Sequence, residues 1–204
     1  MRRIKKDPLN LIIAGTGGQG NILISKLLGE ALLEEDFLVT IGETYGASQR
    51  GGSVASHVRI SREIQCSPIT PQGAADIILS LEPVEALRML AIFGGENSRV
   101  ITNVRPVHPM AVATGEAEYP SLTDIKQAIN RLSKKALYLD ASQIAISLET
   151  PQLTNMVMAG ALIGSGVLSL TQNTFEKQLE MMFQADKLTS NMKAFRLGVA
   201  AVKN

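Results

Sequence analysis

Short apolar segments alternate with amphipathic ones along the first two thirds of the chain. The apolar segments have the length of buried strands, and the amphipathic ones repeat with the 3.6-residue period of a helix. The expected strands are 9–14, 37–41, 53–60, 76–81, 99–104 and 136–140, and the expected helices are 21–35, 83–93 and 123–132. Strands that alternate with helices predict an α/β fold with a mostly parallel sheet.

Two regions depart from this alternation. The strand at 53–60 is followed by a polar turn and a short segment, 64–67, which together predict a β-hairpin. The last third is helical throughout, over 155–165, 174–185 and 188–202. The pattern therefore predicts a Rossmann-like, doubly wound and mostly parallel sheet, with one β-hairpin excursion and a helical C-terminal third.

Composition limits the classes of function. Hydrophobic residues make up 45% of the 204 residues and aromatic ones only 4%, so the core must consist of aliphatic side chains and methionine. The 20 basic and 19 acidic side chains nearly cancel, which argues against nucleic acid as a partner. No apolar run reaches the ~18 residues of a membrane span, and we expect a cytoplasmic protein. The single cysteine, Cys66, cannot hold an iron–sulfur cluster alone.

A glycine-rich turn, 15–20, joins the first strand to the first helix. Its glycines Gly15, Gly17 and Gly20 have the G-x-G-x-x-G spacing of dinucleotide-binding turns. In such turns Gly15 would permit a tight bend, Gly17 would let a phosphate approach the backbone, and Gly20 would let helix and strand pack closely. The N–H groups of the helix N-terminus would then face an anion. A tight turn with no ligand is the alternative.

Glu43 is consistent with a second possible function, the binding of a dinucleotide. Classical NAD binding needs an acidic residue at the end of the second strand, and Glu43 lies near that place. The chain could thus be a free-standing NAD(P)- or flavin-binding protein. However, Glu43 begins an unusual polar and glycine-rich segment, 43–52, in which Arg50 offers a planar fork for phosphate or carboxylate. A third interpretation is an interaction protein whose glycine turn binds nothing.

Residues beyond this segment have simpler interpretations. His57 and Arg59 share one face of a strand, and the exposed side of an outer strand is favoured over a catalytic role. Glu82, Asn103 and Asp140 all follow predicted strands, where α/β sheets bind ligands. Helix capping is favoured for Glu82 and Asp140, which leaves Asn103 as the site candidate.

The two glycine-containing segments together carry a family resemblance. Gly-Thr-Gly-Gly-Gln-Gly, followed by Glu-Thr-Tyr-Gly-Ala-Ser-Gln-Arg-Gly-Gly-Ser-Val-Ala-Ser-His-Val-Arg, resembles the gamma subunit of the 2-oxoacid:ferredoxin oxidoreductases, and most of all the beta chain of indolepyruvate ferredoxin oxidoreductase. Similar stretches follow in the family's order at 67–68, 75–83, Asn103, 139–141 and 155–162. Tyr45 is a departure, since a histidine is expected there in indolepyruvate-type chains.

The resemblance implies a role within a larger enzyme. Such complexes oxidatively decarboxylate a 2-oxoacid to an acyl-CoA and pass the electrons to ferredoxin. Thiamine diphosphate, Mg and [4Fe-4S] clusters are expected on a catalytic partner subunit, with coenzyme A as co-substrate and no cofactor tightly bound by this chain. Residues 1–204 would form a single gamma-type domain, inactive alone and able to form a homodimer when isolated, without nucleic acid or membrane as partners.

The residues implied to bind a cofactor or co-substrate come from both glycine-containing segments and one strand end. None is expected to be catalytic or to bind a metal. They are Gly15, Gly17, Gly18, Gln19, Gly20, Tyr45, Gly46, Arg50, Gly51, Gly52 and Asn103.

Overall fold

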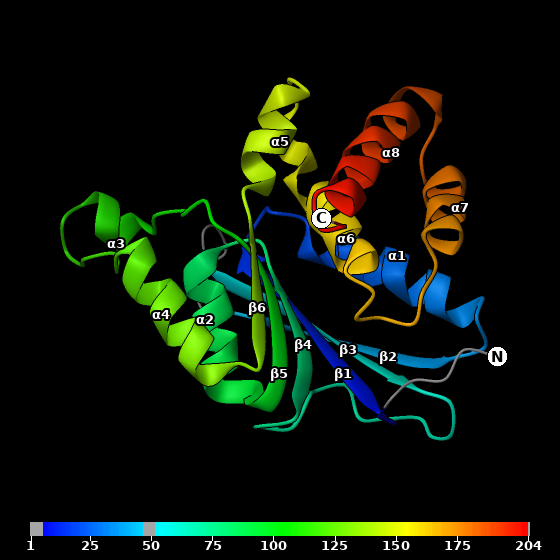
Figure 1. Cartoon of the computed structure of the whole chain (residues 1–204), viewed down its shortest axis with the longest axis horizontal. Coiled ribbons are helices and arrows are strands. Elements are labelled where there is room, and N and C mark those ends of the chain that lie inside the picture. The colour runs from blue at the N-terminus through cyan, green and yellow to red at the C-terminus, as the bar shows by residue number, and fades with distance from the viewer. Residues whose placement is uncertain (1–5, 47–51, 204) are drawn as a thin grey trace.

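The computed structural model describes residues 6–46 and 52–203. Within them, one six-stranded sheet has the order β2-β3-β1-β4-β5-β6 (Figure 1). Strands β1, β4, β5 and β6 are mutually parallel, and β3 is antiparallel to both of its neighbours, β1 and β2. The strands are β1 (Leu9–Thr16), β2 (Leu38–Tyr45), β3 (Ser53–Ser61), β4 (Ala75–Ser80), β5 (Gly94–Asn103) and β6 (Lys135–Leu139). The predicted α/β class and mostly parallel sheet are confirmed.

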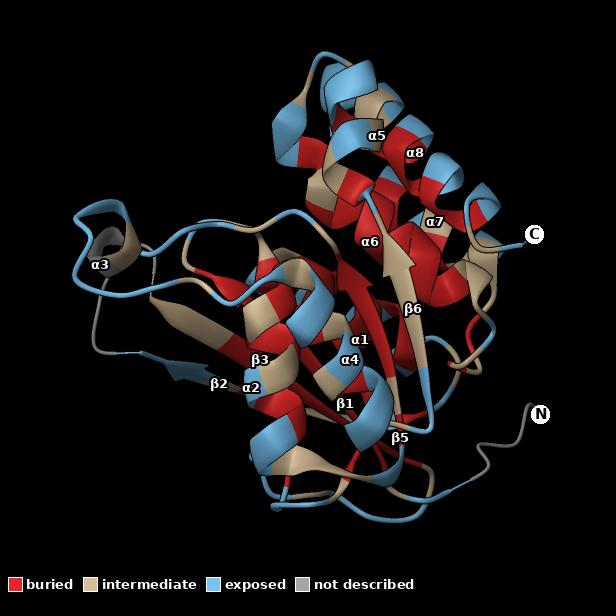
Figure 2. Ribbon diagram, turned by 60° about the vertical axis from the view of Figure 1, so that its left-hand side comes forward, coloured by how far each residue is buried: buried red, intermediate tan, exposed pale blue. Residues whose placement is uncertain are grey.

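Helices cover both faces of the sheet. One face carries α2 and α4, and the other carries α1 and the helices of the C-terminal third (Figures 1 and 2). The helices are α1 (Asn21–Leu33), α2 (Pro83–Phe93), α3 (Met110–Ala113), α4 (Leu122–Leu132), α5 (Ala141–Ser147), α6 (Thr154–Gly164), α7 (Gln172–Met182) and α8 (Ala185–Ala200), with a 3₁₀ turn at Pro151–Leu153.

The central strand β1 explains why its sequence is an unbroken apolar run. Its side chains alternate between the two faces. Leu11 and Ile13 belong to the larger core under α1 and α6, whereas Ile12 and Ala14 belong to the smaller core under α2 and α4. Because both faces are covered, every residue of β1 is buried.

The predicted hairpin has a different partner from the expected one. Strand β3 pairs with β2, which precedes it, and residues 64–67 form no strand. Since β3 also pairs with β1, it is an inner strand, and the prediction that His57 and Arg59 lie on the exposed side of an outer strand is wrong. His57 packs edge-on against the Phe93 ring, with 5.0 Å between centroids. The Arg59 guanidinium donates to Asn10 Oδ1 at 2.9 Å.

The C-terminal helices α6 and α8 cross closely. A Cβ on Gly160 would lie 2.0 Å from the carbonyl oxygen of Phe195, and one on Gly198 would lie 1.9 Å from that of Val157. Backbone therefore packs on backbone where α6 crosses α8. Beside them the Phe175 and Phe195 rings stack, with 4.8 Å between centroids.

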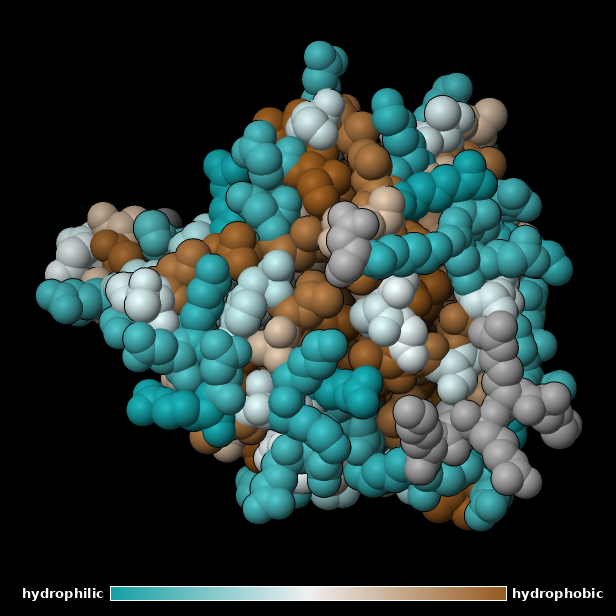
Figure 3. Space-filling view, viewed as in Figure 1, coloured by the Kyte–Doolittle hydropathy of each residue, from teal (hydrophilic) through white to brown (hydrophobic). Residues whose placement is uncertain are grey.

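The outer strand β2 is the least buried part of the sheet (Figure 2). Leu38, Ile41 and Tyr45 are exposed on it, as are Ile22 and Leu33 on neighbouring α1. Apolar side chains also reach the surface between the helical layer and the sheet on the face seen in Figure 3. Among the described residues, no helix is long and apolar enough to cross a membrane.

Candidate functional site

The glycine-rich turn joins β1 to α1 and bends sharply. Gly18 has φ +96° and Gly20 has φ +90°, both in the left-handed region that favours glycine. Gly20 is also the residue that precedes the first turn of α1. The tight turn predicted from the glycine spacing is therefore present at the carboxyl end of β1.

Gln19 holds this turn together. Its side-chain Oε1 accepts a hydrogen bond from the Thr16 N–H at 2.7 Å, and its Nε2 donates to the Leu81 carbonyl at 3.3 Å. A Cβ on Gly15 would lie 2.6 Å from the same Oε1. Gly15 thus makes room for the Gln19 amide, which braces the turn against the end of β4.

Gly20 lies close to helix α6, and not to the strand that the sequence predicted as its neighbour. A Cβ there would lie 2.3 Å from the Nδ2 atom of Asn155, in the first turn of α6. The expected role in packing helix α1 on its strand is therefore wrong. Gly20 instead lets the N-terminal ends of α1 and α6 lie side by side.

The second glycine-containing segment returns to the same place. The Gly17 N–H donates to the Gly52 carbonyl at 2.9 Å, and the Gly46 N–H donates to the Ser53 carbonyl at 2.7 Å. Tyr45 lines a hollow together with glycines of the turn. The structure thus brings Tyr45, Gly46 and Gly52 to the glycine turn, whereas Arg50 and Gly51 lie outside the described residues.

Two hollows flank the turn. The larger, of about 420 Å³, lies between the turn and the starts of α5 and α6. It is lined by Gly18, Gln19, Gly20, Leu81, Ser142, Pro151, Gln152, Thr154 and Asn155. The smaller, of about 340 Å³, lies toward the ends of β2 and β3. It is lined by Thr16, Gly17, Gly18, Gly20, Asn21, Ile22, Tyr45 and Val54.

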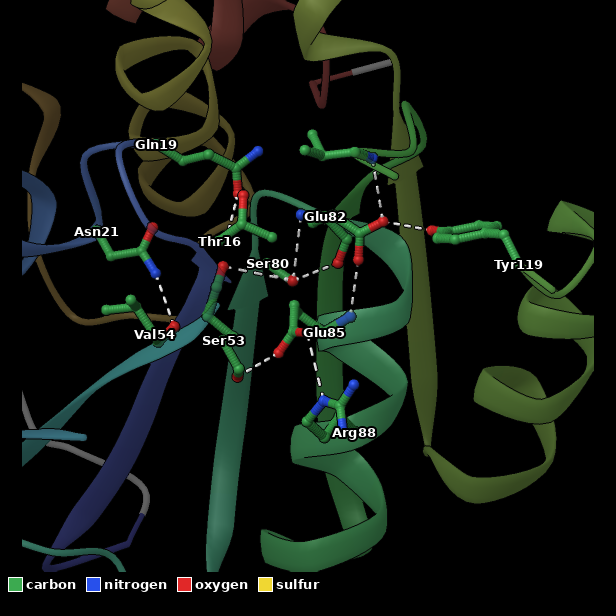
Figure 4. A network of polar contacts seen from close by, with 12 residues as sticks. Thr16, Gln19, Asn21, Ser53, Val54, Ser80, Glu82, Glu85, Arg88 and Tyr119 are labelled. Atoms are coloured by element: carbon green, nitrogen blue, oxygen red, sulfur yellow. Dashed lines mark hydrogen bonds and ion pairs between the residues drawn. The ribbon is translucent and has the colours of Figure 1, made fainter. Parts of the chain in front are cut away.

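Asn21 carries an unpaired acceptor beside the smaller hollow. Its Nδ2 donates to the Val54 carbonyl at 2.9 Å, but its Oδ1 is buried and has no hydrogen-bond partner among the described residues (Figure 4). Buried acceptors are normally paired. A donor supplied by a bound molecule or a partner chain would complete this site.

Asn103 has a supporting position. It is buried, and its Nδ2 donates to the Leu81 carbonyl at 3.2 Å and to Ser142 Oγ at 3.0 Å. Its Oδ1 accepts from the Ala141 N–H at 3.1 Å. Asn103 therefore fixes the start of α5, and Ser142 is the residue that lines the hollow.

The expected caps are confirmed. The Asp140 carboxylate accepts from the Gln143 N–H at 2.9 Å, and the Glu82 carboxylate accepts from the Glu85 N–H at 2.9 Å. Buried Glu82 is also bonded by the Tyr119 hydroxyl (Figure 4). Burial, and then this bond, raise the pKa of Tyr119. The contact ties the segment after β5 to the start of α2.

Glu85 extends this network toward the glycine turn. Its carboxylate accepts from Ser53 Oγ at 2.5 Å and from the Arg88 guanidinium at 3.3 Å (Figure 4). Ser53 follows Gly52, whose carbonyl bonds the Gly17 N–H. Glu85 thus anchors the residues that close the second glycine-containing segment.

Glu43 is separated from the glycine turn. It lies within β2, and antiparallel β3 stands between β2 and β1. Its carboxylate accepts from the Tyr45 hydroxyl, and this bond is the main cause that raises the pKa of Tyr45. Glu43 lines neither hollow beside the turn. The acid expected for a dinucleotide ribose is therefore not placed as in a classical NAD site.

The described residues contain no group of three or more His, Cys, Asp or Glu side chains placed to hold a metal ion. Cys66 is a free thiol. His57 is fully buried, and its Nδ1 accepts from the Thr70 N–H at 3.4 Å. Among the described residues, the polar groups that line the two hollows beside the glycine turn are backbone groups, amides and hydroxyls, and the backbone N–H groups suit binding of an anionic molecule.

The fold is a Rossmann-like α/β protein, in which the glycine turn and the end of the second glycine-containing segment meet at the carboxyl edge of the sheet. Comparison with protein families gives the particular family. The model of pyruvate ferredoxin/flavodoxin oxidoreductase matches residues 10–201. The chain belongs to this family, which confirms the resemblance to subunits of the 2-oxoacid:ferredoxin oxidoreductases.

Individual proteins with similar sequences or folds are also oxidoreductase subunits. The chain is 39% identical over 195 residues to the indolepyruvate oxidoreductase subunit IorB of Pyrococcus horikoshii, covering 95% of this chain and 96% of that one. Its fold is similar to a pyruvate oxidoreductase subunit from Thermotoga maritima, with TM-score 0.70, 22% identity and coverage of 96% and 97%.

A third similarity is to a longer chain. The 2-oxoglutarate:ferredoxin oxidoreductase from Magnetococcus marinus, with 2-oxoglutarate, coenzyme A and succinyl-CoA bound, matches with TM-score 0.74 and 20% identity. The match covers 98% of this chain but 32% of that one. In that protein the same fold is therefore one part of a larger polypeptide.

The sequence did not identify every residue that lines this edge of the sheet. Asn21, Ser142 and Asn155 line the two hollows. Asn21 follows the glycine turn directly, and its position could have identified it. Asn155 lies in a family-like stretch but is distant in sequence, and only the packing of α6 on Gly20 reveals its place.

Proposed function

We propose that this chain is the subunit that holds coenzyme A for a catalytic partner in a 2-oxoacid:ferredoxin oxidoreductase complex. The complex oxidises a 2-oxoacid to acyl-CoA and reduces ferredoxin. The observation that carries the proposal is the convergence of the glycine turn, Tyr45, Gly46 and Gly52 at the carboxyl edge, where backbone N–H groups can meet a phosphate. Arg50 and Gly51, which the resemblance also implies as binding residues, lie between Gly46 and Gly52 in the sequence.

The redox chemistry is assigned to the partner. Thiamine diphosphate with Mg, and [4Fe-4S] clusters, need metal-binding carboxylates and several thiolates. The described residues hold no metal-binding group of three, and Cys66 is the single cysteine of the chain. Electrons would pass to ferredoxin through the partner. We propose that this chain forms one domain, works in the cytoplasm and has no turnover alone.

We further propose an aryl-pyruvate such as indolepyruvate as substrate, because the Pyrococcus horikoshii relative is an indolepyruvate oxidoreductase subunit. The test is to purify the complex through a tag on this chain and to measure ferredoxin reduction with indolepyruvate, pyruvate and 2-oxoglutarate, each with and without coenzyme A. We expect ferredoxin reduction that depends on coenzyme A and is fastest with indolepyruvate. Reduction that does not need coenzyme A would contradict it.

A free-standing dinucleotide-binding protein is the alternative. Such a protein needs an acidic residue beside the glycine turn, but strand β3 separates Glu43 from the turn. We therefore expect no tight binding of NAD(P) or flavin by the isolated chain. A micromolar dissociation constant in calorimetry, about −8 kcal/mol, would favour the alternative instead.

A further inference from the structure

We infer that strand β2 is the interaction surface for a second copy of this chain, which pairs with it antiparallel across a two-fold axis at Ile41. The two sheets would then join into one continuous sheet, with the α1 helices of the two copies side by side over the junction. This pairing goes beyond the proposed function, since it involves neither coenzyme A nor a redox group.

The main-chain groups of β2 determine which residues can pair. Strand β2 lies at one end of the sheet and is bonded on one side to β3 (Figure 2). The Gly46 N–H donates to the Ser53 carbonyl, so in this register the even-numbered residues of β2 bond to β3. The N–H and C=O groups of Val39, Ile41 and Glu43 therefore point outward, where they have no backbone partner among the described residues.

This edge lacks the features that keep the sheet edges of monomeric proteins from pairing. Such edges are protected by proline, lysine, a β-bulge or a covering segment. The eight residues of β2 include neither proline nor lysine, and they pair with β3 without a register shift. Gln65 bonds the Thr40 hydroxyl, and Pro68 lies where a Cβ of Gly42 would point. The segment after β3 thus covers a face of β2 and leaves its edge open.

Apolar side chains gather along the same edge. Ile22 and Leu33 on α1, and Leu38, Ile41 and Tyr45 on β2, are between 37% and 64% exposed. A hollow of about 170 Å³ between α1 and β2 is lined by Ile22, Leu33 and Ile41. Large apolar side chains that are exposed together mark an interaction surface. A strand that extends the sheet at β2 would cover them.

Charge complementarity identifies the partner as a second copy. Helix α1 leads back from the end of β1 and runs antiparallel to β2, and a Cβ on Gly29 would lie 2.9 Å from Ile41 Cδ1. Exposed Lys26 and Glu30 lie on either side of Gly29 and line the hollow. Neither has an ion-pair partner among the described residues. A two-fold axis at Ile41 turns the second α1 end for end, so that Lys26 of each copy opposes Glu30 of the other.

The same charges fix the register. An axis at Ile41 places this residue opposite its own copy and Val39 opposite Glu43. A shift of the axis by one strand residue, about 3.4 Å, corresponds to about two residues of a helix. An axis one residue earlier would therefore bring the two Glu30 side chains together, and an axis one residue later the two Lys26 side chains. Like charges that face each other are destabilising, which leaves the axis at Ile41.

The test measures self-association of the full-length chain by sedimentation equilibrium. Lys26→Glu and Glu30→Lys each place like charges opposite each other across the axis. We expect each to raise the dissociation constant of the dimer by about tenfold or more. The double variant Lys26→Glu/Glu30→Lys restores opposite charges and should return the constant close to the wild-type value. The control Lys187→Glu reverses an exposed charge on α8 and should leave the constant unchanged.

A disulfide tests the register without any change of charge. In a Cys66→Ser background, Ile41→Cys would place two thiols in a hydrogen-bonded antiparallel pair, where the Cα atoms are about 5.5 Å apart and within reach of a disulfide. We expect mild oxidation to give a covalent dimer. Leu38→Cys is the matched control, since it would lie about 20 Å from its own copy and should not cross-link.

Three results would overturn the pairing. They are a monomeric wild-type chain, a double variant that associates as weakly as the single ones, and cross-linking through Leu38→Cys but not through Ile41→Cys. If the chain is monomeric while Lys26→Glu weakens its co-purification with the catalytic partner, β2 binds that partner instead. A monomeric chain whose complex still needs coenzyme A for turnover leaves the proposed function intact, so the two proposals can fail separately.

Discussion

The crossing of α6 with α8 and the turn between β1 and α1 both depend on glycine, but different neighbours approach the glycines. At the crossing, added Cβ atoms on Gly160 and Gly198 would meet backbone oxygens at 2.0 and 1.9 Å. At the turn, an added Cβ on Gly18 would meet no described residue within 4 Å, and one on Gly20 would meet the Asn155 amide.

The glycines of the two regions therefore have different roles. Glycines at the crossing are enclosed by protein, so they serve packing and should affect stability alone. Those at the turn border open hollows and should affect binding as well as stability. Substitutions at the two places should therefore have different effects on stability and binding.

The largest effect is expected at the crossing. Gly198→Ala forces a methyl group against the Val157 backbone, which cannot move without separating the helices. We expect a loss of about 3 kcal/mol or more of unfolding free energy, measured by urea denaturation. Gly29→Ala is the matched control inside α1, where the methyl group meets only the end of the Ile41 side chain. It should be neutral or stabilising by up to about 1 kcal/mol.

Gly20→Ala comes next. Its left-handed φ of +90° disfavours alanine, and the methyl group would collide with Asn155 Nδ2. We expect a stability loss of about 2 kcal/mol together with weaker binding of coenzyme A. Stability and calorimetry on the same preparation check both parts. Full retention of coenzyme A binding would show that the hollows beside Gly20 do not hold coenzyme A.

His57 is another residue that the protein encloses, so it should affect stability. Burial lowers the pKa of His57 from 6.5, so the unfolded chain binds the proton more readily than the folded one. Stability should therefore fall as pH falls below about 6.5, by at most about 1.4 kcal/mol per pH unit for this group. His57→Asn retains an acceptor for the Thr70 N–H and should flatten the slope. Urea denaturation between pH 7 and 5 is the measurement, and an unchanged slope would exclude His57 as the cause.

The smallest effect on stability is expected for Gly18→Ala. No atom of the described residues lies within 4 Å of the added methyl group, so the strain of φ +96° is the main cost, at about 1 kcal/mol. Because Gly18 borders both hollows, the methyl group should nevertheless weaken binding of coenzyme A. A variant that loses stability without any change in affinity would erase the distinction between the turn and the crossing.

Much of the fold could be predicted from the sequence because parallel strands covered on both faces leave unbroken apolar runs. Leu9–Thr16 and Ala75–Ser80 are of this kind, and both were recognised as strands. The pairing of β3 could not be predicted, because local alternation does not reveal which distant strand lies alongside. The polar side chains His57 and Arg59 suggested exposure, whereas Phe93 and Asn10 receive them inside the protein.

The site was predictable where its chemistry is local. The spacing of Gly15, Gly17 and Gly20 predicted a turn that the structure contains. Asn103 was expected to face a ligand, but a polar side chain at a strand end can equally hold the next helix, as it does here for α5. Asn155 has no local signal, since its place depends on how α6 packs against the turn.

The most direct test of the central claim is purification of the tagged full-length chain from its source cells, with thiamine diphosphate and iron measured per copy of the chain. We expect a larger partner subunit that contains both thiamine diphosphate and iron, together with coenzyme A-dependent ferredoxin reduction on addition of a 2-oxoacid. A chain that purifies alone, with a bound dinucleotide and neither thiamine diphosphate nor iron, would contradict it.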